Sequence, residues 1–347
     1  MPELSFLDAL SRRPMVFDGA MGSLLYESGW FINHSFDEAN LKKPESVLEC
    51  HRSYVRAGAD ILESNTFSAN RFLLGRYGLS ESVAEVNRRG VELAREAAGT
   101  DIYVAGSIGP TGEAFGRFSD TRAARIRAAF DEQVAALLEA SPDIIVLETF
   151  HHLHEIRVAM ESVRAHFQGP IVAQMSFEAE ATLRDGSRAG EVAERLRDMG
   201  ADVVGVNCAL GPQEVFEVSR QMVAAGVPVS AQPNAGMPRR LDERMLYMST
   251  PEYFGVFARR MLKAGVRLVG GCCGTNPEHI RTVAAACRMM GGSGIELVAP
   301  PPLSETRQGR PDQKTIEPVP TANKSKLAAK VMRVFQEPIA KNGPRKP

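Results

Sequence analysis

The chain has 347 residues, of which 44% are hydrophobic, and its formal net charge is −1 at neutral pH. This length can bury the core of one large domain or two ordinary ones, and the near-zero charge argues against nucleic acid or a membrane surface as a partner. No apolar run reaches the roughly 18 residues of a membrane helix, and the N-terminal segment lacks an apolar signal core. We therefore expect a cytoplasmic protein that acts on a small molecule.

Taken in chain order, short apolar runs alternate with amphipathic helical segments eight times, up to about residue 292. Each run begins with apolar residues and ends with polar residues or glycine. The runs span residues 15–22, 60–67, 102–110, 143–150, 170–177, 202–209, 228–236 and 266–274. Between them, apolar residues recur at steps of three and four, as in Ile126, Phe130, Val134 and Leu137.

Eight such units in a row predict an α/β fold of the (β/α)8 TIM barrel type, whose active site lies at the C-terminal ends of the strands. The polar ends of the eight runs agree with that placement. A doubly wound open sheet is the alternative, but no G-x-G-x-x-G turn follows the first run and the sequence has no P-loop. We therefore expect a barrel domain over residues 1–295.

Two segments depart from this alternation. The first connection, roughly residues 23–44, is long and contains Trp30, the single tryptophan. A loop of this length acts either as a lid over the active face or as a packed surface loop. From residue 296 the chain is rich in proline and polar residues, so residues 296–347 are expected to form a linker-like tail, with one short basic helix over 324–337.

Three of the five cysteines lie at the ends of predicted strands. Cys208 ends the sixth run, and Cys272 and Cys273 are adjacent in the eighth. Neighbouring Cα atoms are about 3.8 Å apart, closer than in ordinary disulfides, so the adjacent pair is not expected to form a bridge. The flanking glycines let the backbone bend until both sulfurs face one point. Because alternate barrel strands contribute to the same layer, the three thiols can meet.

Three thiols at one point indicate a metal site. Sulfur-rich sets select zinc or an iron–sulfur cluster, and clusters need four closely spaced cysteines, which this chain lacks. Three protein ligands with an open fourth position are typical of catalytic zinc. We therefore predict that Cys208, Cys272 and Cys273 bind Zn²⁺ and form a catalytic centre that activates a substrate thiol for alkyl transfer. A zinc hydrolase is a weaker interpretation, since histidine and carboxylate ligands are common there.

Other strand ends offer contacts for an amino-acid substrate. Asp18 in "DGAMG" and Glu148 in "LETF" could bind an ammonium group, and the backbone N–H groups of Gly19 and Met21 could bind a carboxylate. Alternatively, Asp18 supports a turn and Glu148 forms a structural ion pair. Weaker candidates for substrate binding are Asn65, Thr66 and Asn234.

The remaining cysteines are interpreted as buried small apolar residues, and a histidine cluster as solvated or hydrogen-bonding side chains. Cys287 lies on the apolar face of a helix predicted near residues 277–290, and Cys50 is expected to be buried in the same way. The segment "HHLHE" at residues 151–155 follows the fourth run, but its spacing is that of a helix entry and not of the H-E-x-x-H zinc motif.

The segments "DGAMGSLL", "GADILESNTF", "GVNCALGP", "PNAG" and "GGCCGTNPEHI", in this order over about residues 14–290, resemble the homocysteine S-methyltransferase family. The resemblance implies a (β/α)8 barrel in which three cysteines bind zinc and the zinc holds homocysteine as its thiolate. It assigns the substrate amino group to the two carboxylates named above and the substrate carboxylate to the two backbone N–H groups. The implied reaction is methyl transfer to homocysteine, which forms methionine.

Further segments, "ANLKKPESVLECHRSYVRAGAD", "RYGL" and "TPEYF", look most like the barrel half of bifunctional proteins that also contain a methylenetetrahydrofolate reductase. The chain ends about 50 residues past the barrel, so we expect no second catalytic domain and no folate or cobalamin module. The methyl donor stays open among S-methylmethionine, S-adenosylmethionine, betaine and a methyl-folate. The alternative function is a non-catalytic or truncated subunit that binds zinc and homocysteine and acts with a separate folate or reductase partner. Association with a partner protein or with a second copy of the chain also stays open.

Overall fold

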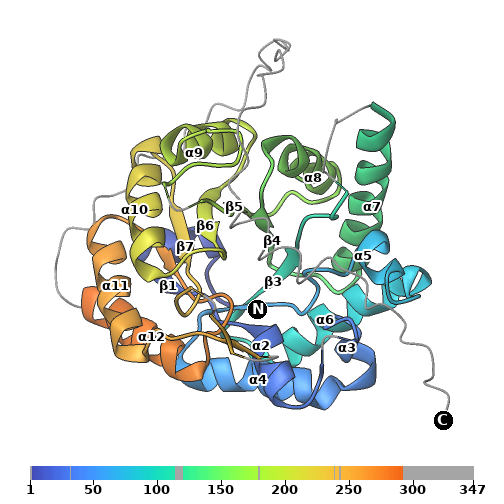
Figure 1. Ribbon diagram of the computed structural model, residues 1–347, viewed down its shortest axis with the longest axis horizontal. Helices are drawn as coiled ribbons and strands as arrows, with labels where there is room; N and C mark the ends of the chain where they lie inside the picture. The colour runs from blue at the N-terminus through green and yellow to red at the C-terminus, as the bar shows by residue number, and fades with distance from the viewer. Residues whose placement is uncertain are drawn as a thin grey trace. The chain divides into compact units, whose positions relative to one another are not determined.

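The computed structural model describes residues 2–31, 33–113, 120–178, 180–237, 239–241 and 244–291. Within them, eight parallel strands follow one another around a ring in the order β1-β10-β7-β6-β5-β4-β3-β2 (Figure 1). The strands are β1 (Met15–Val16), β2 (Ile61–Glu63), β3 (Tyr103–Ile108), β4 (Ile144–Phe150), β5 (Ile171–Met175), β6 (Val203–Asn207), β7 (Val229–Gln232) and β10 (Leu268–Val269). A parallel bridge between Phe17 and Ile61 links the two ends of the sheet. The predicted (β/α)8 TIM barrel is confirmed, and each predicted run contains one strand.

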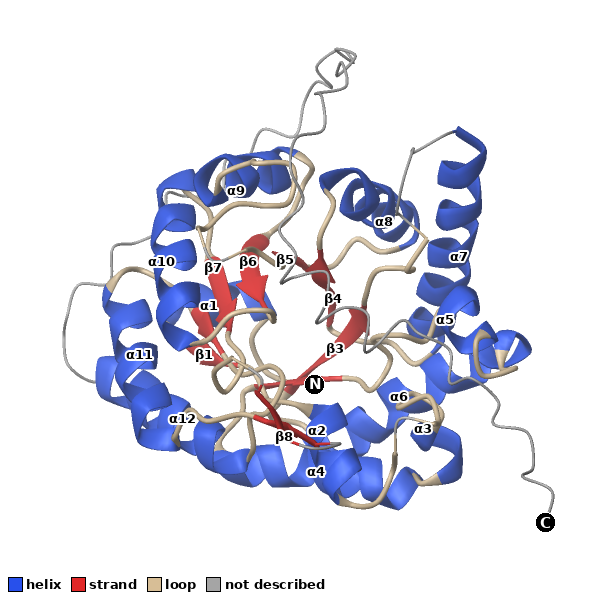
Figure 2. Cartoon of the chain, viewed as in Figure 1, coloured by secondary structure: helices blue, strands red, loops and turns tan. Residues whose placement is uncertain are grey.

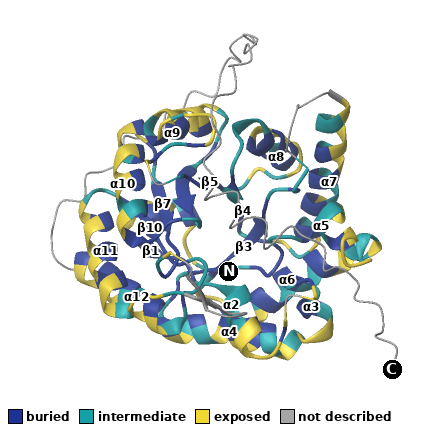
Figure 3. Cartoon of the chain, in the orientation of Figure 1, coloured by how far each residue is buried: buried dark blue, intermediate teal, exposed yellow. Residues whose placement is uncertain are grey.

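Helices surround the strands (Figure 2). They are α1 (Phe6–Arg12), α2 (Met21–Glu27), α3 (Ala39–Lys42), α4 (Pro44–Ala57), α5 (Arg71–Gly75), α6 (Val83–Ala98), α7 (Asp120–Glu139), α8 (Leu153–His166), α9 (Ala189–Asp198), α10 (Pro212–Met222), α11 (Pro251–Lys263) and α12 (Pro277–Gly291). Their buried faces turn toward the strands and their exposed faces outward (Figure 3). The predicted stripe from Ile126 to Leu137 lies buried on α7, as expected for a helix packed against the barrel.

The N-terminal end of the barrel is covered by α1. Phe6 and Leu10 of this helix pack in one apolar cluster with the first residues of several strands, among them Met15 and Ile61. The buried guanidinium group of Arg267 donates a hydrogen bond of 2.6 Å to the carbonyl oxygen of Leu10. The opposite end, where the strands finish, therefore remains for the functional site.

The connection that contains Trp30 is a packed loop. Trp30 is 8% exposed, and its Nε1 donates a hydrogen bond of 2.9 Å to the carbonyl oxygen of Ser35. Its ring belongs to an apolar cluster with Leu25, Val47 and Leu48. Of the two interpretations of this segment, the structure favours the packed surface loop over a free lid.

A small antiparallel hairpin, absent from the sequence prediction, follows β7. Its strands are β8 (Arg239–Leu241) and β9 (Arg244–Leu246), and they form a sheet separate from the barrel. The expected tail at 296–347, with its short helix, lies outside the described residues, so the domain boundary at 295 stays a prediction. In the described part of the chain, no helix has both the length and the apolar character needed to cross a membrane.

Candidate active site

Three sulfur atoms converge at the C-terminal ends of the barrel strands. Cys208 follows β6, and Cys272 and Cys273 lie shortly after β10. The three Sγ atoms lie within 4.8 Å of one another, and those of Cys208 and Cys273 are 3.8 Å apart. Thiolates around one tetrahedral zinc ion, each about 2.3 Å from it, are separated by about 3.8 Å. The arrangement therefore fits a metal ion bound by three cysteines.

The end of β7 holds both cysteine segments in place. The backbone N–H of Cys208 donates to the carbonyl oxygen of Gln232 at 3.1 Å, and that of Cys272 donates to Pro233 at 2.8 Å. The carbonyl oxygen of Cys273 accepts a bond of 2.9 Å from the N–H of Ala235. Because β7 lies between β6 and β10 in the sheet, one strand end sets the relative position of all three thiols.

The three thiols already interact electrostatically. Hydrogen bonds from Cys208 and Cys272 hold the pKa of Cys273 well below its usual value. The hydrogen bonds that Cys272 makes with Cys208 and Cys273, together with burial, raise the pKa of Cys272. The pKa of Cys273 is thus lowered while that of Cys272 is raised, and a bound cation would favour ionisation of all three thiols.

Tyr247, which sequence reasoning did not single out, contacts this centre. It follows β9, and its hydroxyl group hydrogen-bonds to the sulfur of Cys273. Its ring fills the space beside Gly274, where an added Cβ would lie 2.1 Å from the Tyr247 Cγ. Gly274 has a φ of +77°, which also favours glycine. Tyr247 could not be identified from the predicted barrel strands, because it follows a hairpin that the sequence analysis did not predict.

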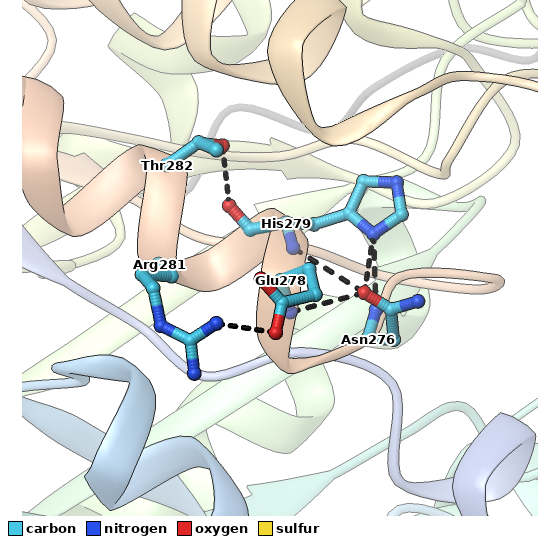
Figure 4. Close-up of polar contacts among 5 residues, drawn as sticks. All are labelled: Asn276, Glu278, His279, Arg281 and Thr282. Atoms are coloured by element: carbon cyan, nitrogen blue, oxygen red, sulfur yellow. Dashed lines mark hydrogen bonds and ion pairs between the residues drawn. The ribbon is translucent and has the colours of Figure 1, made fainter.

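The turn after the cysteine pair is bonded to the start of α12 (Figure 4), and α12 is bonded in turn to the segment before α11. The side-chain oxygen of Asn276 accepts hydrogen bonds from the N–H groups of Glu278 and His279, at 3.1 and 3.3 Å. The His279 ring donates from Nε2 to the carbonyl oxygen of Ser249 at 3.0 Å. This histidine therefore anchors the helix beside the sulfur centre, which gives it a structural role.

A second group at the same strand ends consists of three carboxylates. Asp18 follows β1 and is 2% exposed, Glu63 is the last residue of β2, and Glu148 lies in β4. Burial raises the pKa of Glu148 to about 7, and burial likewise raises the pKa values of Asp18 and Glu63 well above their usual range. We call these three residues the acidic cage. It would attract a cation.

Each member of the acidic cage is held by hydrogen bonds. Asp18 Oδ2 accepts from the backbone N–H of Glu63 at 3.1 Å. Glu148 accepts from Ser107 Oγ at 2.5 Å and from Asn207 Nδ2 at 3.0 Å. None of these partners is a lysine or arginine, so the structural ion pair considered for Glu148 is not observed among the described residues.

Glu63 was missed by sequence reasoning, although it lies two residues before Asn65, which was chosen from the same run. Its position as the last residue of a strand is the signal that could have identified it, since barrel sites are built there. A single glutamate at a strand end is nevertheless common. Only the closure of the ring, which brings β2 beside β1, shows that it joins the other two carboxylates.

The backbone groups proposed for a substrate carboxylate are open to a ligand. Within the described residues, the N–H groups of Gly19 and Met21 make no hydrogen bond, and α2 begins at Met21 without a side-chain cap. The intervening N–H of Ala20 is bonded to Thr275 Oγ1 at 3.1 Å. This bond ties the turn after β1 to the turn after the cysteine pair.

Asn234 lies in the segment after β7 whose backbone is bonded to the cysteine pair. Asn234 is 3% exposed, and its Oδ1 atom is buried without a hydrogen-bond partner in the described structure. It is flanked by Pro233 and Ala235, whose backbone atoms bind the cysteine pair. An unpartnered acceptor at this position supports its selection as a candidate binding residue, which stays a prediction.

Asn65 and Thr66 are engaged within the protein. Asn65 Nδ2 donates to the Phe36 carbonyl oxygen and to Asn40 Oδ1, at 2.8 and 3.0 Å. Thr66 is fully buried, and its hydroxyl donates to the Ser107 carbonyl oxygen at 2.7 Å. These bonds fix the loop after β2, and a direct contact of either side chain with a substrate stays a prediction.

The two remaining cysteines lie in the apolar core, and the histidine segment leads into α8. Cys50 and Cys287 are buried in apolar clusters, and burial raises the pKa of each thiol to about 12. In the histidine segment, α8 begins at Leu153 as predicted, and burial lowers the pKa of His151 to about 4. Among the described residues, the three cysteines at the strand ends are the one group with metal-ligand spacing.

Comparisons with known proteins point to one family. A profile of the homocysteine S-methyltransferase family matches residues 15–287. The methionine synthases of Mycobacterium tuberculosis (strain ATCC 25618 / H37Rv) and Mycobacterium leprae (strain TN) are 34% and 33% identical over 303 residues, which is 82% of this chain. The match covers 25% of each relative, so the chain spans about a quarter of their length.

Solved structures agree with the profile. The metallated form of the homocysteine methyltransferase MmuM from Escherichia coli is 25% identical, with a TM-score of 0.68 over 80% of this chain and 97% of that chain. A methyltransferase from Methanosarcina mazei, 12% identical with a TM-score of 0.54 over 82% of this chain and 97% of that chain, shares the fold. The profile spans the barrel from β1 to α12, and the chain belongs to the homocysteine S-methyltransferase family.

Proposed function

We propose that this chain binds zinc through Cys208, Cys272 and Cys273 and transfers a methyl group to the thiol of homocysteine, forming methionine. The observation that carries the proposal is the joint presence, at one end of the barrel, of three converging sulfurs and three carboxylates whose pKa values are raised by their surroundings. A substrate with a thiol and an ammonium group would bind the metal centre through its thiol and the carboxylates through its ammonium group. The family of the chain and its structural similarity to the homocysteine methyltransferase MmuM support the same reaction.

The ion has a defined chemical task at this site. When bound, zinc held by three thiolates would supply the positive charge that keeps a fourth, incoming thiol ionised at neutral pH. The cysteines hold the ion, and the hydroxyl of Tyr247 shares the negative charge of Cys273. Outer hydrogen bonds of this kind orient metal ligands and tune the metal.

The chain's other residues position the substrate. Asp18 and Glu148 bind the ammonium group, and the free N–H groups of Gly19 and Met21 bind the carboxylate. Holding both ends of the amino acid directs its side chain toward the sulfur centre, so the reacting sulfur is oriented before the donor arrives. Asn65, Thr66 and Asn234 complete the proposed surroundings of the substrate.

The methyl donor stays open among S-methylmethionine, S-adenosylmethionine, betaine and a methyl-folate presented directly or by a partner protein. A second candidate function is a non-catalytic subunit that binds zinc and homocysteine for a separate folate or reductase partner. The observation in its favour is that the chain corresponds to only a quarter of the methionine synthases it matches. Self-association belongs to the same open question.

A donor panel tests the proposal. The zinc-loaded full chain is incubated with homocysteine and each donor, and methionine is measured. We expect methionine with at least one donor. Binding of homocysteine without product from any donor would favour the subunit, and absence of homocysteine binding would contradict both functions.

A further inference from the structure

Strand β4 contains a bulge at the point where it enters the site. The register between β4 and β5 shifts between Leu147 and Phe150, where three steps along β4 match two steps along β5. Strand β4 therefore holds one extra residue here, as in a β-bulge. Leu147 and Phe150 both lie in the apolar cluster that the strands share with the surrounding helices. The residues of the bulge are thus Glu148 and Thr149, and the bulge sets the direction of the Glu148 side chain.

The bulge places Thr149 in an unfavourable backbone conformation. Its φ is +61°, in the left-handed region that a β-branched residue rarely adopts. Such a conformation persists only where surrounding contacts hold it, and residues of this kind are concentrated at functional sites. The contacts that hold Thr149 therefore also hold the direction of Glu148.

One buried amide, that of Asn207, makes these contacts. Its Oδ1 accepts a hydrogen bond of 2.7 Å from the backbone N–H of Thr149, and its Nδ2 donates to Thr149 Oγ1 at 2.8 Å and to Glu148 Oε2 at 3.0 Å. Asn207 is fully buried, and both N–H groups of its amide are used on the bulge. Because β5 lies between β4 and β6, the side chain of Asn207 joins two strands that are not neighbours in the sheet.

Asn207 also stands directly before a sulfur of the metal centre. It is the last residue of β6, and the next two residues, Cys208 and Ala209, have φ values of +57° and +56°. The chain therefore leaves its extended conformation immediately after Asn207. The backbone of this residue leads into the Cys208 thiol, while its side chain holds the carboxylate of Glu148.

We propose that Asn207 is a positioning residue, which holds the β4 bulge and so directs the carboxylate of Glu148 toward the ammonium group of the substrate. This inference rests on the proposed function and deepens it, because it names the group on which the contact of Glu148 with the substrate depends. Ser107 Oγ holds the other oxygen of the carboxylate, so Asn207 is the partner that links Glu148 to the bulge.

A double-mutant cycle tests the proposal. Isothermal titration of the zinc-loaded full chain gives the Kd of homocysteine for the wild type, Asn207→Ala, Glu148→Gln and the double variant. We expect Asn207→Ala to raise the Kd about tenfold when Glu148 is present, because the carboxylate loses its direction. In the Glu148→Gln background the rise should be less than about threefold, since no charge is left to direct. A rise by the same factor in both backgrounds would indicate a general structural defect and overturn the assignment.

A matched control separates positioning from stability. Asn87 is another fully buried asparagine, and its Nδ2 donates to the carbonyl oxygens of Ala69 and Val83. Asn87→Ala should leave the Kd within about twofold of the wild-type value, because no bond to the bulge is removed. A tenfold rise in this variant as well would show that a loss of buried hydrogen bonds is sufficient, and the assignment would be wrong.

A milder variant decides the question if Asn207→Ala does not fold. Thr149→Val keeps the shape of the side chain and removes the bond between its hydroxyl group and Asn207. We expect the Kd to rise about two- to fivefold when Glu148 is present and to stay unchanged in the Glu148→Gln background. An equal rise in both backgrounds, or no rise in either, would overturn the assignment.

Two further measurements distinguish a failure of this inference from a failure of the proposed function. The zinc content of Asn207→Ala should stay at about one equivalent per chain. Loss of zinc would show that Asn207 acts through Cys208 and would overturn the role assigned through Glu148. If the wild type does not bind homocysteine, or if Glu148→Gln leaves the Kd unchanged, the proposed substrate contacts fail and this inference fails with them. If the wild type makes methionine and the cycle shows no coupling, this inference alone is wrong.

Discussion

At the scale of single residues, the site depends on groups that are unusual in a protein interior. Three thiols hydrogen-bond to one another, which lowers the pKa of Cys273, and three carboxylates, one buried and two half-buried, have no lysine or arginine partner among the described residues. Such groups would be more stable in the occupied protein than in the empty one, because a bound metal ion and a bound ammonium group would neutralise them. Their presence therefore indicates two ligand charges at one end of the barrel.

The cysteine assignment predicts a loss of metal in Cys208→Ala. Removing one of three ligands leaves two sulfurs, which is too few for a tight zinc site. Metal content of the purified variant, measured by mass spectrometry, should fall from about one equivalent per chain to near zero. Cys50→Ala, which changes a thiol buried in an apolar cluster, should keep its zinc. Full metal content in Cys208→Ala would contradict the assignment.

The acidic cage predicts that the stability of the ligand-free chain depends on pH. Burial raises the pKa of Glu148 from 4.5 to about 7 in the folded state, so the folded chain binds more protons than the unfolded chain between these values. The stabilising contribution is complete below about pH 4.5 and is lost as the pH rises toward 7, on the order of 3 kcal/mol for this group. Urea unfolding at pH 5 and pH 8 should therefore show a smaller loss of stability in Glu148→Gln than in the wild type. An equal loss in both would contradict the buried, protonated carboxyl.

At the scale of secondary-structure elements, the site is made where strand ends meet turns. The end of β7 binds the turns after β6 and β10, and the hairpin β8–β9 is followed by Tyr247, which packs on the second cysteine turn. Elements distant in the sequence thus converge on the sulfurs. This explains why the centre needs glycine at particular points, where side chains of other elements approach the backbone closely.

Two glycines with nearly the same φ allow the cost of this close packing to be measured. Gly274 and Gly78 have φ values of +77° and +76°, but an added Cβ meets Tyr247 at the first position and nothing within 4 Å at the second. Both alanine variants bear the conformational cost, and only Gly274→Ala also displaces a ring. We expect Gly274→Ala to lower the free energy of unfolding by about 1–3 kcal/mol more than Gly78→Ala, in urea titrations. Equal effects would show that the ring moves away without cost.

At the scale of the whole molecule, the barrel could be predicted because each strand has the same sequence pattern, an apolar run that ends in polar residues or glycine. Cys208, Cys272 and Cys273 could be chosen because cysteines at strand ends are rare. Glu63 could not be chosen in this way, because only the closure of the barrel brings β2 beside β1 and so places Glu63 next to Asp18. The hairpin was not predicted because its segment, "RRLDERMLY", consists mostly of charged residues and lacks the apolar run of a barrel strand. Local pattern therefore predicts elements well, whereas the members of a site depend on contacts between elements.

The central claim is that three cysteine sulfurs hold one zinc ion and leave a position for the sulfur of homocysteine. X-ray absorption at the zinc edge of the full chain, recorded with and without homocysteine, tests it most directly. We predict three sulfur neighbours at about 2.3 Å without the substrate and four with it. An unchanged count of three on addition of saturating homocysteine, or a zinc ion without sulfur neighbours, would contradict the account.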